Sequence, residues 1–139
     1  MQPEDLPQVA EIEHLSFSSP WSRSLFLQEL NNPFSRTLVA ESEGRVTGYL
    51  CRWCVAGEVH ILNLAIHPDY RRRGIAKRLM EEVLTEARAE GVKTVSLEVR
   101  KGNLPAVSLY HHLGFHQIGV RRRYYENRED ALLMVCFLQ

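Results

Sequence analysis

The pattern of apolar and polar residues is clearest in the middle of the chain, where a strand pattern changes to a helix pattern. Residues 61–66 are almost continuously apolar, which is typical of a strand covered on both faces. The next three residues include Pro68, which ends a strand because proline has no N–H to donate. From Gly74 onward the apolar residues recur with a helical period, at Ile75, Leu79, Val83 and Ala87. The pattern therefore predicts a strand, a sharp turn and an amphipathic helix.

Two further helices are predicted near the start of the chain. Residues 3–17 carry apolar side chains every three positions, at Leu6, Val9, Ile12 and Leu15. A second helix over residues 23–30 has Ser22 as a candidate N-cap. Its inward side chains are predicted to be Phe26, Leu27 and Leu30.

The remaining segments predict strands and one more helix. Residues 37–41 and 45–54 read as a hairpin, and residues 94–99 read as a strand in which Glu98 shares a face with polar neighbours. Asn103 is a candidate N-cap for a helix that reaches Leu113, and residues 115–123 and 131–138 complete the pattern as a strand pair. This order predicts a single α/β domain over residues 1–139, with a mixed central sheet flanked by helices. Its strand-helix-strand unit over residues 58–99 should be a right-handed parallel crossover, with a ligand at the carboxyl ends of the strands.

Composition narrows the class of protein. The 139 residues include seventeen basic and seventeen acidic side chains, so the formal charge is zero. A neutral chain argues against bulk nucleic acid or an anionic membrane as the main partner. Neither a membrane-spanning apolar run nor a signal peptide is evident in the sequence, so we expect a cytoplasmic protein.

Cysteine and histidine spacing does not predict a metal site. Cys51 and Cys54 lie in one predicted strand, where an odd separation places their side chains on opposite faces, and no second cysteine pair follows. His112 and His116 are four apart, but Gly114 should end the helix between them. We therefore expect neither a metal nor a disulfide framework.

A basic segment precedes the central helix and suggests an anion site. Arg71, Arg72 and Arg73 lie just before Gly74, where the free N–H groups and positive dipole end of a helix would lie. Glycine permits close approach of a ligand to the main chain, and the small Ala76 keeps that approach open. The alternative is an ordinary solvated helix start. No dinucleotide fingerprint or Walker A loop is present in the sequence.

Several motifs together resemble the GNAT superfamily of N-acetyltransferases. Arg71-x-x-Gly74-x-Ala76 is similar to its acetyl-coenzyme A signature, and Glu98 followed by Asn103, Tyr110 and Gly114-Phe115 is similar to its second half. The segments at residues 19–22 and 122–131 resemble the RimI-type ribosomal-protein alanine acetyltransferases. One departure is clear, because members usually have a strand before the first helix and only two residues precede Pro3 here.

The resemblance implies a set of cofactor-binding residues for acetyl-coenzyme A. The main chain of residues 64–66 would bind the pantetheine arm like a neighbouring strand, and an N–H near Ile66 would hold the oxyanion, where the family's parallel strands splay apart. The helix start would bind the pyrophosphate, and Asn103 the pantetheine end. The predicted set is Leu64, Ala65, Ile66, Arg71, Arg72, Arg73, Gly74, Ile75, Ala76, Lys77 and Asn103.

Glu98 and Tyr110 are the predicted catalytic residues. Glu98 is a carboxylate among mostly apolar neighbours and, by resemblance, occupies the position of the base. The alternative for Glu98 is a structural ion pair with Arg100 or Lys101. Tyr110 is the candidate acid for the coenzyme A thiolate, because a phenol with a pKa near ~10 keeps its proton at pH 7; ordinary helix packing is its alternative.

The predicted acceptor is a protein N-terminal α-amine, by resemblance that of a ribosomal protein. Such an amine, with a pKa of ~8, is roughly a tenth neutral at pH 7, whereas a lysine amine is neutral about once in 2,500 molecules. Two aromatic segments are predicted to form the walls of a peptide groove, or else to be structural. They contribute Phe17, Trp21, Tyr124, Tyr125 and Glu126.

The sequence is also compatible with two alternative functions. One is a GNAT enzyme for lysine side chains or a small amine. The other is an RNA-binding module that uses Arg71 to Arg73 and Arg121 to Arg123, although the sequence lacks the interleaved stacking aromatics and net positive charge of such modules.

Overall fold

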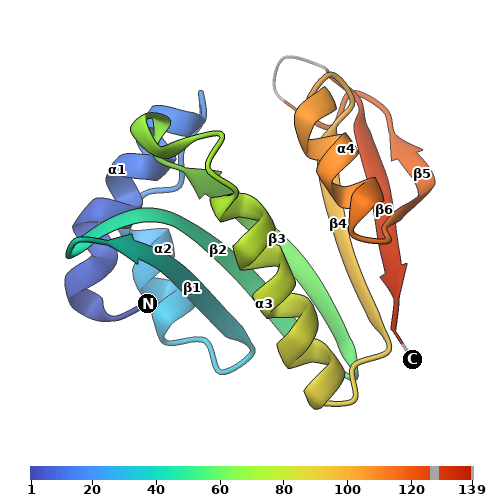
Figure 1. The fold of residues 1–139 in the computed structure, drawn as a ribbon, viewed down its shortest axis with the longest axis horizontal. Coiled ribbons are helices and arrows are strands. Elements are labelled where there is room, and N and C mark those ends of the chain that lie inside the picture. The colour runs from blue at the N-terminus through green and yellow to red at the C-terminus, as the bar shows by residue number, and fades with distance from the viewer. Residues whose placement is uncertain (126–128, 139) are drawn as a thin grey trace.

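The computed structural model describes residues 1–125 and 129–138 and shows helices on both faces of a central sheet (Figure 1). The first part of the chain contains η1 (Pro3–Asp5), α1 (Leu6–Ser16), α2 (Arg23–Leu30), β1 (Ser35–Ser42), β2 (Arg45–Val55) and β3 (Glu58–Ile66). The second part contains η2 (Pro68–Tyr70), α3 (Ile75–Ala89), β4 (Thr94–Arg100), α4 (Leu104–His112), β5 (His116–Arg121) and β6 (Ala131–Phe137). In the described residues no strand precedes α1.

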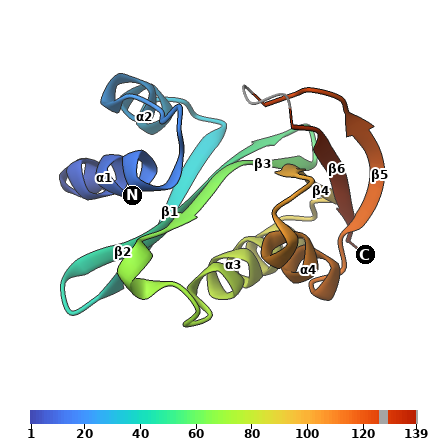
Figure 2. The same cartoon turned by 90° about the horizontal axis from the view of Figure 1, so that it is seen from above.

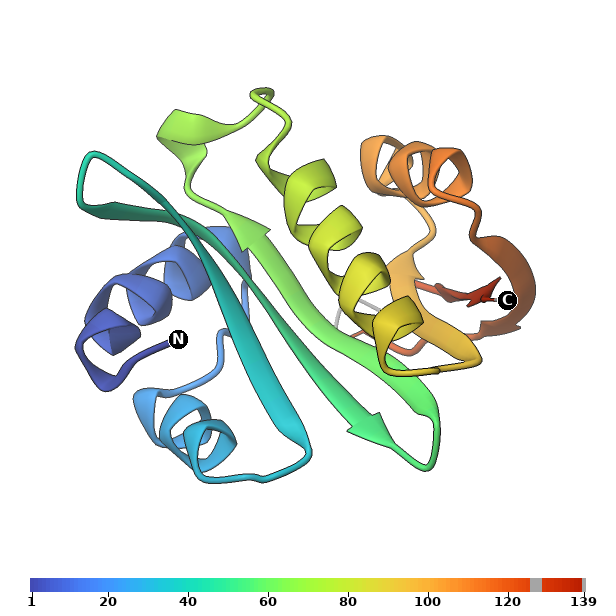
Figure 3. The same ribbon diagram turned by 60° about the horizontal axis from the view of Figure 1, so that its bottom comes forward.

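The sheet has six strands in the order β1-β2-β3-β4-β6-β5. Each neighbouring pair is antiparallel except β3 and β4, which are parallel, as the predicted crossover requires. In Figure 2, α1 and α2 lie on one side of the sheet, and α3 and α4 lie on the other. Figure 3 shows α3 running alongside β3, with α4 on the far side of α3.

The two parallel strands separate partway along their length. Their pairing extends only from Glu58 and Thr94 to Ile61 and Leu97. Beyond that point β3 stays paired with β2, while β4 stays paired with β6. Figure 1 shows the two strands meeting at the bottom of the view and diverging towards the top. The carboxyl ends of β3 and β4 therefore border a gap in the middle of the sheet.

A β-bulge marks the place where β3 leaves β4. On the β2 side, Cys51 pairs with Asn63 but the next residue pairs with Ile61, so Leu62 is the extra residue. Ile61 packs in the core beneath α3, whereas Ala65 packs with the core of α1 and α2. Residues four apart share a face in a regular strand, so the bulge has reversed the alternation of side chains.

Two inward-facing predictions for the N-terminal helices are wrong. Leu15 is 50% exposed and Leu27 is 51% exposed. The buried face of α1 instead passes through Val9, Ile12 and Glu13. A spacing of three drifts around a helix with 3.6 residues per turn, so the fourth apolar residue of such a series leaves the buried face. The hairpin, the central helix and the Ser22 cap of α2, which accepts a hydrogen bond from the Leu25 N–H, agree with the prediction.

Candidate active site

A cavity of about 280 Å³ lies where β3 and β4 separate, and residues from both faces of the sheet line it. It brings together eight of the residues that the sequence predicted, from five separate segments. These are Phe17, Trp21, Leu64, Glu98, Asn103, Tyr110, Tyr124 and Tyr125. The other lining residues are Glu13, Ser19, Ile61, Leu62, Asn63, Leu97, Val99 and Arg100.

Glu98 enters this cavity from β4. Val95, Leu97 and Val99 point into the core beneath the helices, so the alternation of the strand directs Glu98 to the opposite face, towards α1. Its side chain is only 16% exposed. One carboxylate oxygen lies 3.4 Å from His60 Nε2 and the other lies 4.0 Å from Arg121 Nη2. The carboxylate is therefore shielded from bulk water and has basic groups beside it.

Tyr110 enters the cavity from the other face of the sheet, on α4. Asn103 caps this helix, because its side-chain oxygen accepts a 3.3 Å hydrogen bond from the Ala106 N–H. The Tyr110 ring packs against Phe115, with 5.8 Å between centroids, and the residue is buried. Burial, and to a smaller degree the nearby Tyr125, raise the pKa of Tyr110 to about 12. Its hydroxyl therefore keeps its proton at neutral pH and can act as a donor.

The two aromatic segments both line the cavity, through Phe17, Trp21, Tyr124 and Tyr125, although Glu126 lies outside the described residues. The rings of Tyr124 and Tyr125 meet edge to face, with centroids 5.1 Å apart. A guanidinium group also lies over each ring. The guanidinium carbon of Arg121 is 5.4 Å from the centre of the Tyr124 ring, and that of Arg100 is 4.0 Å from the centre of the Tyr125 ring. Such stacking gives the aromatic wall a defined orientation.

Glu13 is a cavity residue that sequence analysis missed. It lies on α1 and is only 1% exposed. One oxygen accepts hydrogen bonds from the Tyr49 hydroxyl and the Asn63 amide, and the other accepts from the Trp21 N–H at 2.8 Å. Burial and the Glu13 carboxylate raise the pKa of Tyr49 above its ordinary value. Glu13 therefore joins α1, β2, β3 and the segment that carries Trp21.

The signal for Glu13 in the residue pattern is weak. It follows Ile12 within the amphipathic stretch of α1, where a glutamate normally reads as a solvated side chain. Its partners Tyr49 and Asn63 are 36 and 50 residues away. No local spacing connects them, so the cluster forms only after the sheet is assembled.

The three residues at the end of β3 that were predicted to bind the cofactor have their side chains in different surroundings. Leu64 lines the cavity, and Ile66 packs against the core beneath α3. The Ala65 side chain is buried on the side of α1 and α2, so only its main chain is available to a ligand in the gap. Beyond the last pair with β4, the described residues show no β4 partner for this stretch. A bound chain could therefore hydrogen-bond to it as a strand would.

A glycine in β2 brings the end of β3 close to the start of α3. A Cβ on Gly48 would lie 2.6 Å from Ile66 Cδ1, 3.2 Å from the Ala65 oxygen and 3.4 Å from Ile75 Cγ2. A larger residue would have to displace the Ile66 side chain and crowd the Ala65 carbonyl, so this glycine lets β2 lie close to both the strand end and the helix start. Sequence analysis did not select it.

The predicted anion cradle lies at the N-terminus of α3, outside the cavity lining. Gly74 is the N-cap with φ +79°, and a Cβ placed there would meet nothing within 4 Å. Arg72 also has a positive φ, at +63°. Ile75, Ala76 and Lys77 form the first turn of α3, whose N–H groups have no partner within the helix. This terminus is an open site of the kind that binds phosphate groups.

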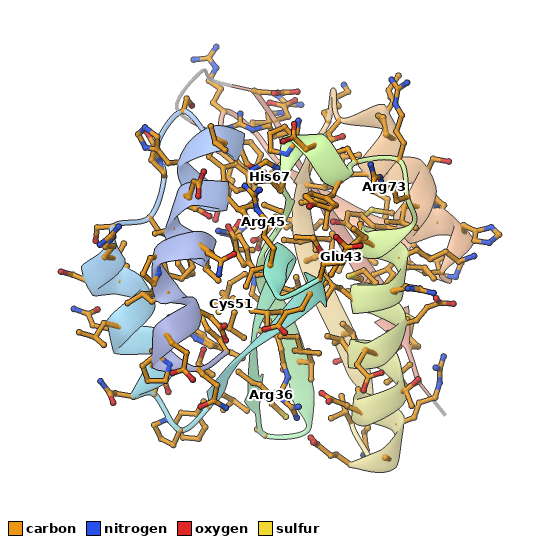
Figure 4. The ribbon with its side chains drawn as sticks, turned by 60° about the vertical axis from the view of Figure 1, so that its left-hand side comes forward. Arg36, Glu43, Arg45, Cys51, His67 and Arg73 are labelled. Atoms are coloured by element: carbon orange, nitrogen blue, oxygen red, sulfur yellow. The ribbon has the colours of Figure 1, made fainter. Side chains whose placement is uncertain are left out.

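The three arginines before Gly74 are not equivalent. Arg71 donates from Nε to the Ile66 carbonyl at 3.2 Å, and its Nη2 lies 3.5 Å from Ser16 Oγ. The Arg73 guanidinium lies 5.1 Å from the centre of the Tyr70 ring. Figure 4 labels Arg73 near the start of α3 and His67 beyond the end of β3. Arg71 thus joins the end of β3 to α1, while Arg73 stays beside the helix terminus.

The described residues were compared with the requirements of a metal site and of a membrane-spanning helix. Within residues 1–125 and 129–138, no three His, Cys, Asp or Glu side chains are placed to hold a metal ion. His112 ends α4 and His116 begins β5, so the two do not share a helical face. None of the described helices is long and apolar enough to cross a membrane.

The sequence matches a known protein family and is similar to named bacterial proteins along most of its length. Residues 6–115 match the Acetyltransferase (GNAT) family. A Bacillus subtilis (strain 168) protein, provisionally named ribosomal protein bS18-alanine N-acetyltransferase, is 40% identical over 136 residues, which is 96% of this chain and 90% of that protein. The Escherichia coli (strain K12) ribosomal protein bS18-alanine N-acetyltransferase is 34% identical over 133 residues, covering 94% and 89% of the two chains.

A solved structure extends this similarity to three dimensions. The crystal structure of the ribosomal-protein-S18-alanine N-acetyltransferase from Escherichia coli superposes with a TM-score of 0.94 at 32% identity. The match covers 100% of this chain and 91% of the other.

Proposed function

The chain belongs to the GNAT family of acetyltransferases, and on that premise we propose that it acetylates the N-terminal alanine of a small-subunit ribosomal protein. Its fold and its relatives make it an acetyl-coenzyme A-dependent N-acetyltransferase. The named acceptor of the relatives supports a ribosomal protein as the partner. The observation that carries the proposal is the gap between β3 and β4, which Glu98 borders from one face and Tyr110 from the other.

The two faces of the gap separate the two substrates. The acceptor peptide enters from the face of α1 and α2, between Phe17 and Trp21 on one wall and Tyr124 and Tyr125 on the other. Acetyl-coenzyme A enters from the face of α3 and α4, and supplies an activated acetyl thioester. Both substrates are bound together, so the amine attacks the thioester directly in a ternary complex.

The proposed cofactor residues follow the course of β3 and α3. The main chain of Leu64, Ala65 and Ile66 holds the pantetheine arm, and an N–H near Ile66 donates to the oxyanion. The N–H groups at the start of α3 and the nearby cationic side chains hold the pyrophosphate. Asn103, which lines the cavity, lies at the pantetheine end.

Glu98 and Tyr110 divide the proton transfers. Glu98 accepts a proton from the attacking amine, directly or through water. Tyr110 donates its proton to the departing thiolate. Its raised pKa of about 12 keeps the phenol protonated at neutral pH, so the proton is in place when the thiolate forms. An α-amine suits this arrangement because about a tenth of it is already neutral at pH 7.

A peptide panel tests the proposed acceptor. Peptides that begin with alanine and contain one internal lysine are offered with a free or a blocked α-amine, and the acetylated position is identified by mass spectrometry. The proposal predicts modification of the α-amine only, and no reaction of the blocked peptide. Acetylation of the blocked peptide at lysine would favour the lysine-directed alternative. A preference for small amines over every peptide would favour the small-amine alternative.

A further inference from the structure

His60 is a titratable residue beside Glu98 that the proposed mechanism has not used. It lies on β3, where its main chain pairs with Ser96 of β4. Its Nδ1 lies 2.9 Å from Ser96 Oγ, and its Nε2 lies 3.4 Å from Glu98 Oε2. Both ring nitrogens therefore have a partner on β4, and the ring connects Ser96 to Glu98.

The geometry allows His60 to exchange a proton with Glu98. In one tautomer Nδ1 donates to Ser96 Oγ, which leaves the Nε2 lone pair directed to the Glu98 carboxyl group. The 3.4 Å separation is slightly longer than a usual hydrogen bond, and catalytic hydrogen bonds commonly shorten when substrates bind. Histidine is also the side chain whose ordinary pKa lies nearest to neutral pH.

The two side chains differ in solvent exposure, and this difference sets the direction in which a proton leaves the pair. The Glu98 side chain is 16% exposed, whereas the His60 side chain is 35% exposed. A proton on Glu98 lies inside the cavity, but a proton on the more exposed His60 can pass to water. Among the described residues, Arg121 lies 4.0 Å from the second Glu98 oxygen and Tyr125 is close enough to interact electrostatically with Glu98, while Trp53 is the neighbour of His60 on β2.

We infer that His60 is a positioning residue for Glu98 that also carries its proton to solvent, an inference that rests on the proposed function. As the amine attacks, an N–H bond breaks and an O–H bond forms on Glu98. That O–H bond then breaks as Nε2 of His60 takes the proton, and the imidazolium returns to neutral by giving a proton to water or to a buffer base. Glu98 is thereby restored as a carboxylate for the next turnover.

The test is chemical rescue of His60→Ala by imidazole in the full-length enzyme. We expect kcat to fall about tenfold or more, while KM for the peptide and for acetyl-coenzyme A changes less than about twofold. Added imidazole should restore part of kcat in His60→Ala, and restore none in Glu98→Gln. A residue that only supports the strand would not respond to a small base. His116→Ala, which removes an exposed histidine of β5, is the matched control and should behave like wild type.

A second variant protects the test against a folding defect. His60→Gln keeps a hydrogen-bonding side chain of similar reach but cannot carry the proton, and thermal melting checks that it is folded. We expect the same loss of kcat as in His60→Ala. Normal kcat in folded His60→Gln, or loss without any rescue by imidazole in His60→Ala, overturns the inference. Wild type that acetylates no amine overturns the proposed function and this inference with it.

Discussion

The two sides of the gap, which we propose bind the acceptor and the cofactor, are built in opposite ways. On the acceptor side, the buried Glu13 carboxylate binds Tyr49, Asn63 and the main chain of Trp21. On the cofactor side, the start of α3 is open to solvent and is shaped by the positive φ of Gly74. One side is held by side chains from distant segments, and the other by the main chain of one short segment.

This difference predicts how each side responds to substitution. Loss of the Glu13 carboxylate leaves several hydrogen-bond donors without an acceptor, so it should lower both the stability of the fold and the affinity for the acceptor. A side chain at Gly74 meets no neighbouring atoms, so its cost to the fold is limited to the backbone strain of a non-glycine residue at φ +79°, and its main effect should be on the ligand. Variants paired with matched controls separate these two responses.

The largest effect is expected for Gly74→Glu on the cofactor side. A carboxylate at the N-cap of α3 places negative charge and bulk where the pyrophosphate should approach. We expect acetyl-coenzyme A affinity to fall by about a hundredfold or more, or about 3 kcal/mol, as measured by calorimetry.

Gly57→Glu is the matched control for this variant. Gly57 has the same φ of +79°, and a Cβ placed on it would also meet nothing within 4 Å, but it lies in the turn between β2 and β3. Both variants should therefore have similar thermal stability, and only Gly74→Glu should lose cofactor binding. Equal cofactor affinity in the two would show that the helix terminus does not bind the pyrophosphate.

An intermediate effect is expected for Glu13→Ala on the acceptor side. The variant leaves the Tyr49, Asn63 and Trp21 donors without their buried acceptor. We expect a loss of about 2 to 4 kcal/mol in unfolding free energy, measured in denaturant. KM for the peptide should rise about tenfold, while acetyl-coenzyme A affinity should change less than about twofold.

Glu11→Ala is the control, because Glu11 is an exposed glutamate on the same helix. It should change stability by less than about 0.5 kcal/mol and leave peptide KM unaltered. If Glu13→Ala matched Glu11→Ala in both measurements, the acceptor side would not depend on the buried carboxylate.

The smallest effect is expected for Tyr110→Phe at alkaline pH. The folded-state pKa of Tyr110, about 12, is above the ordinary 10.0, so the tyrosine is protonated in both states below about pH 10. Above that pH the unfolded state ionises first, and stability falls as pH rises through the folded pKa. The shift corresponds to roughly 2 to 3 kcal/mol. Denaturation between about pH 9 and pH 12 should show a shallower loss for Tyr110→Phe, and parallel losses would contradict this.

The difference between a local segment and a cluster of distant segments also explains what could be predicted from the sequence. The segment proposed to hold the cofactor spans residues 71–77 at the start of the helical period, and because these residues are adjacent in the chain their local structure leaves a readable pattern. Glu98 was also predictable, because strand alternation fixes the face on which it lies. In both cases the decisive interactions are local.

The Glu13 cluster escaped prediction because its geometry depends on the assembled sheet. The bulge at Leu62 reverses the alternation of β3, so the face occupied by Asn63 could not be counted from Ile61. The Glu13 cluster and the contact between Gly48 and Ile66 likewise join distant segments. Their free-energy gain is realised only when α1, β2 and β3 are packed together.

We propose that Glu98 and Tyr110 act at opposite ends of one acetyl transfer, and a direct test of this claim is the kcat of Glu98→Gln and Tyr110→Phe from about pH 6 to about pH 10. Glu98→Gln should lose rate at neutral pH and recover part of it at high pH, as the amine loses its proton unaided. Tyr110→Phe should lose about 100- to 10,000-fold and show no such recovery, because the thiolate still lacks its donor. Near-normal rates for both variants across this range would contradict the claim, since proximity alone would then carry the reaction.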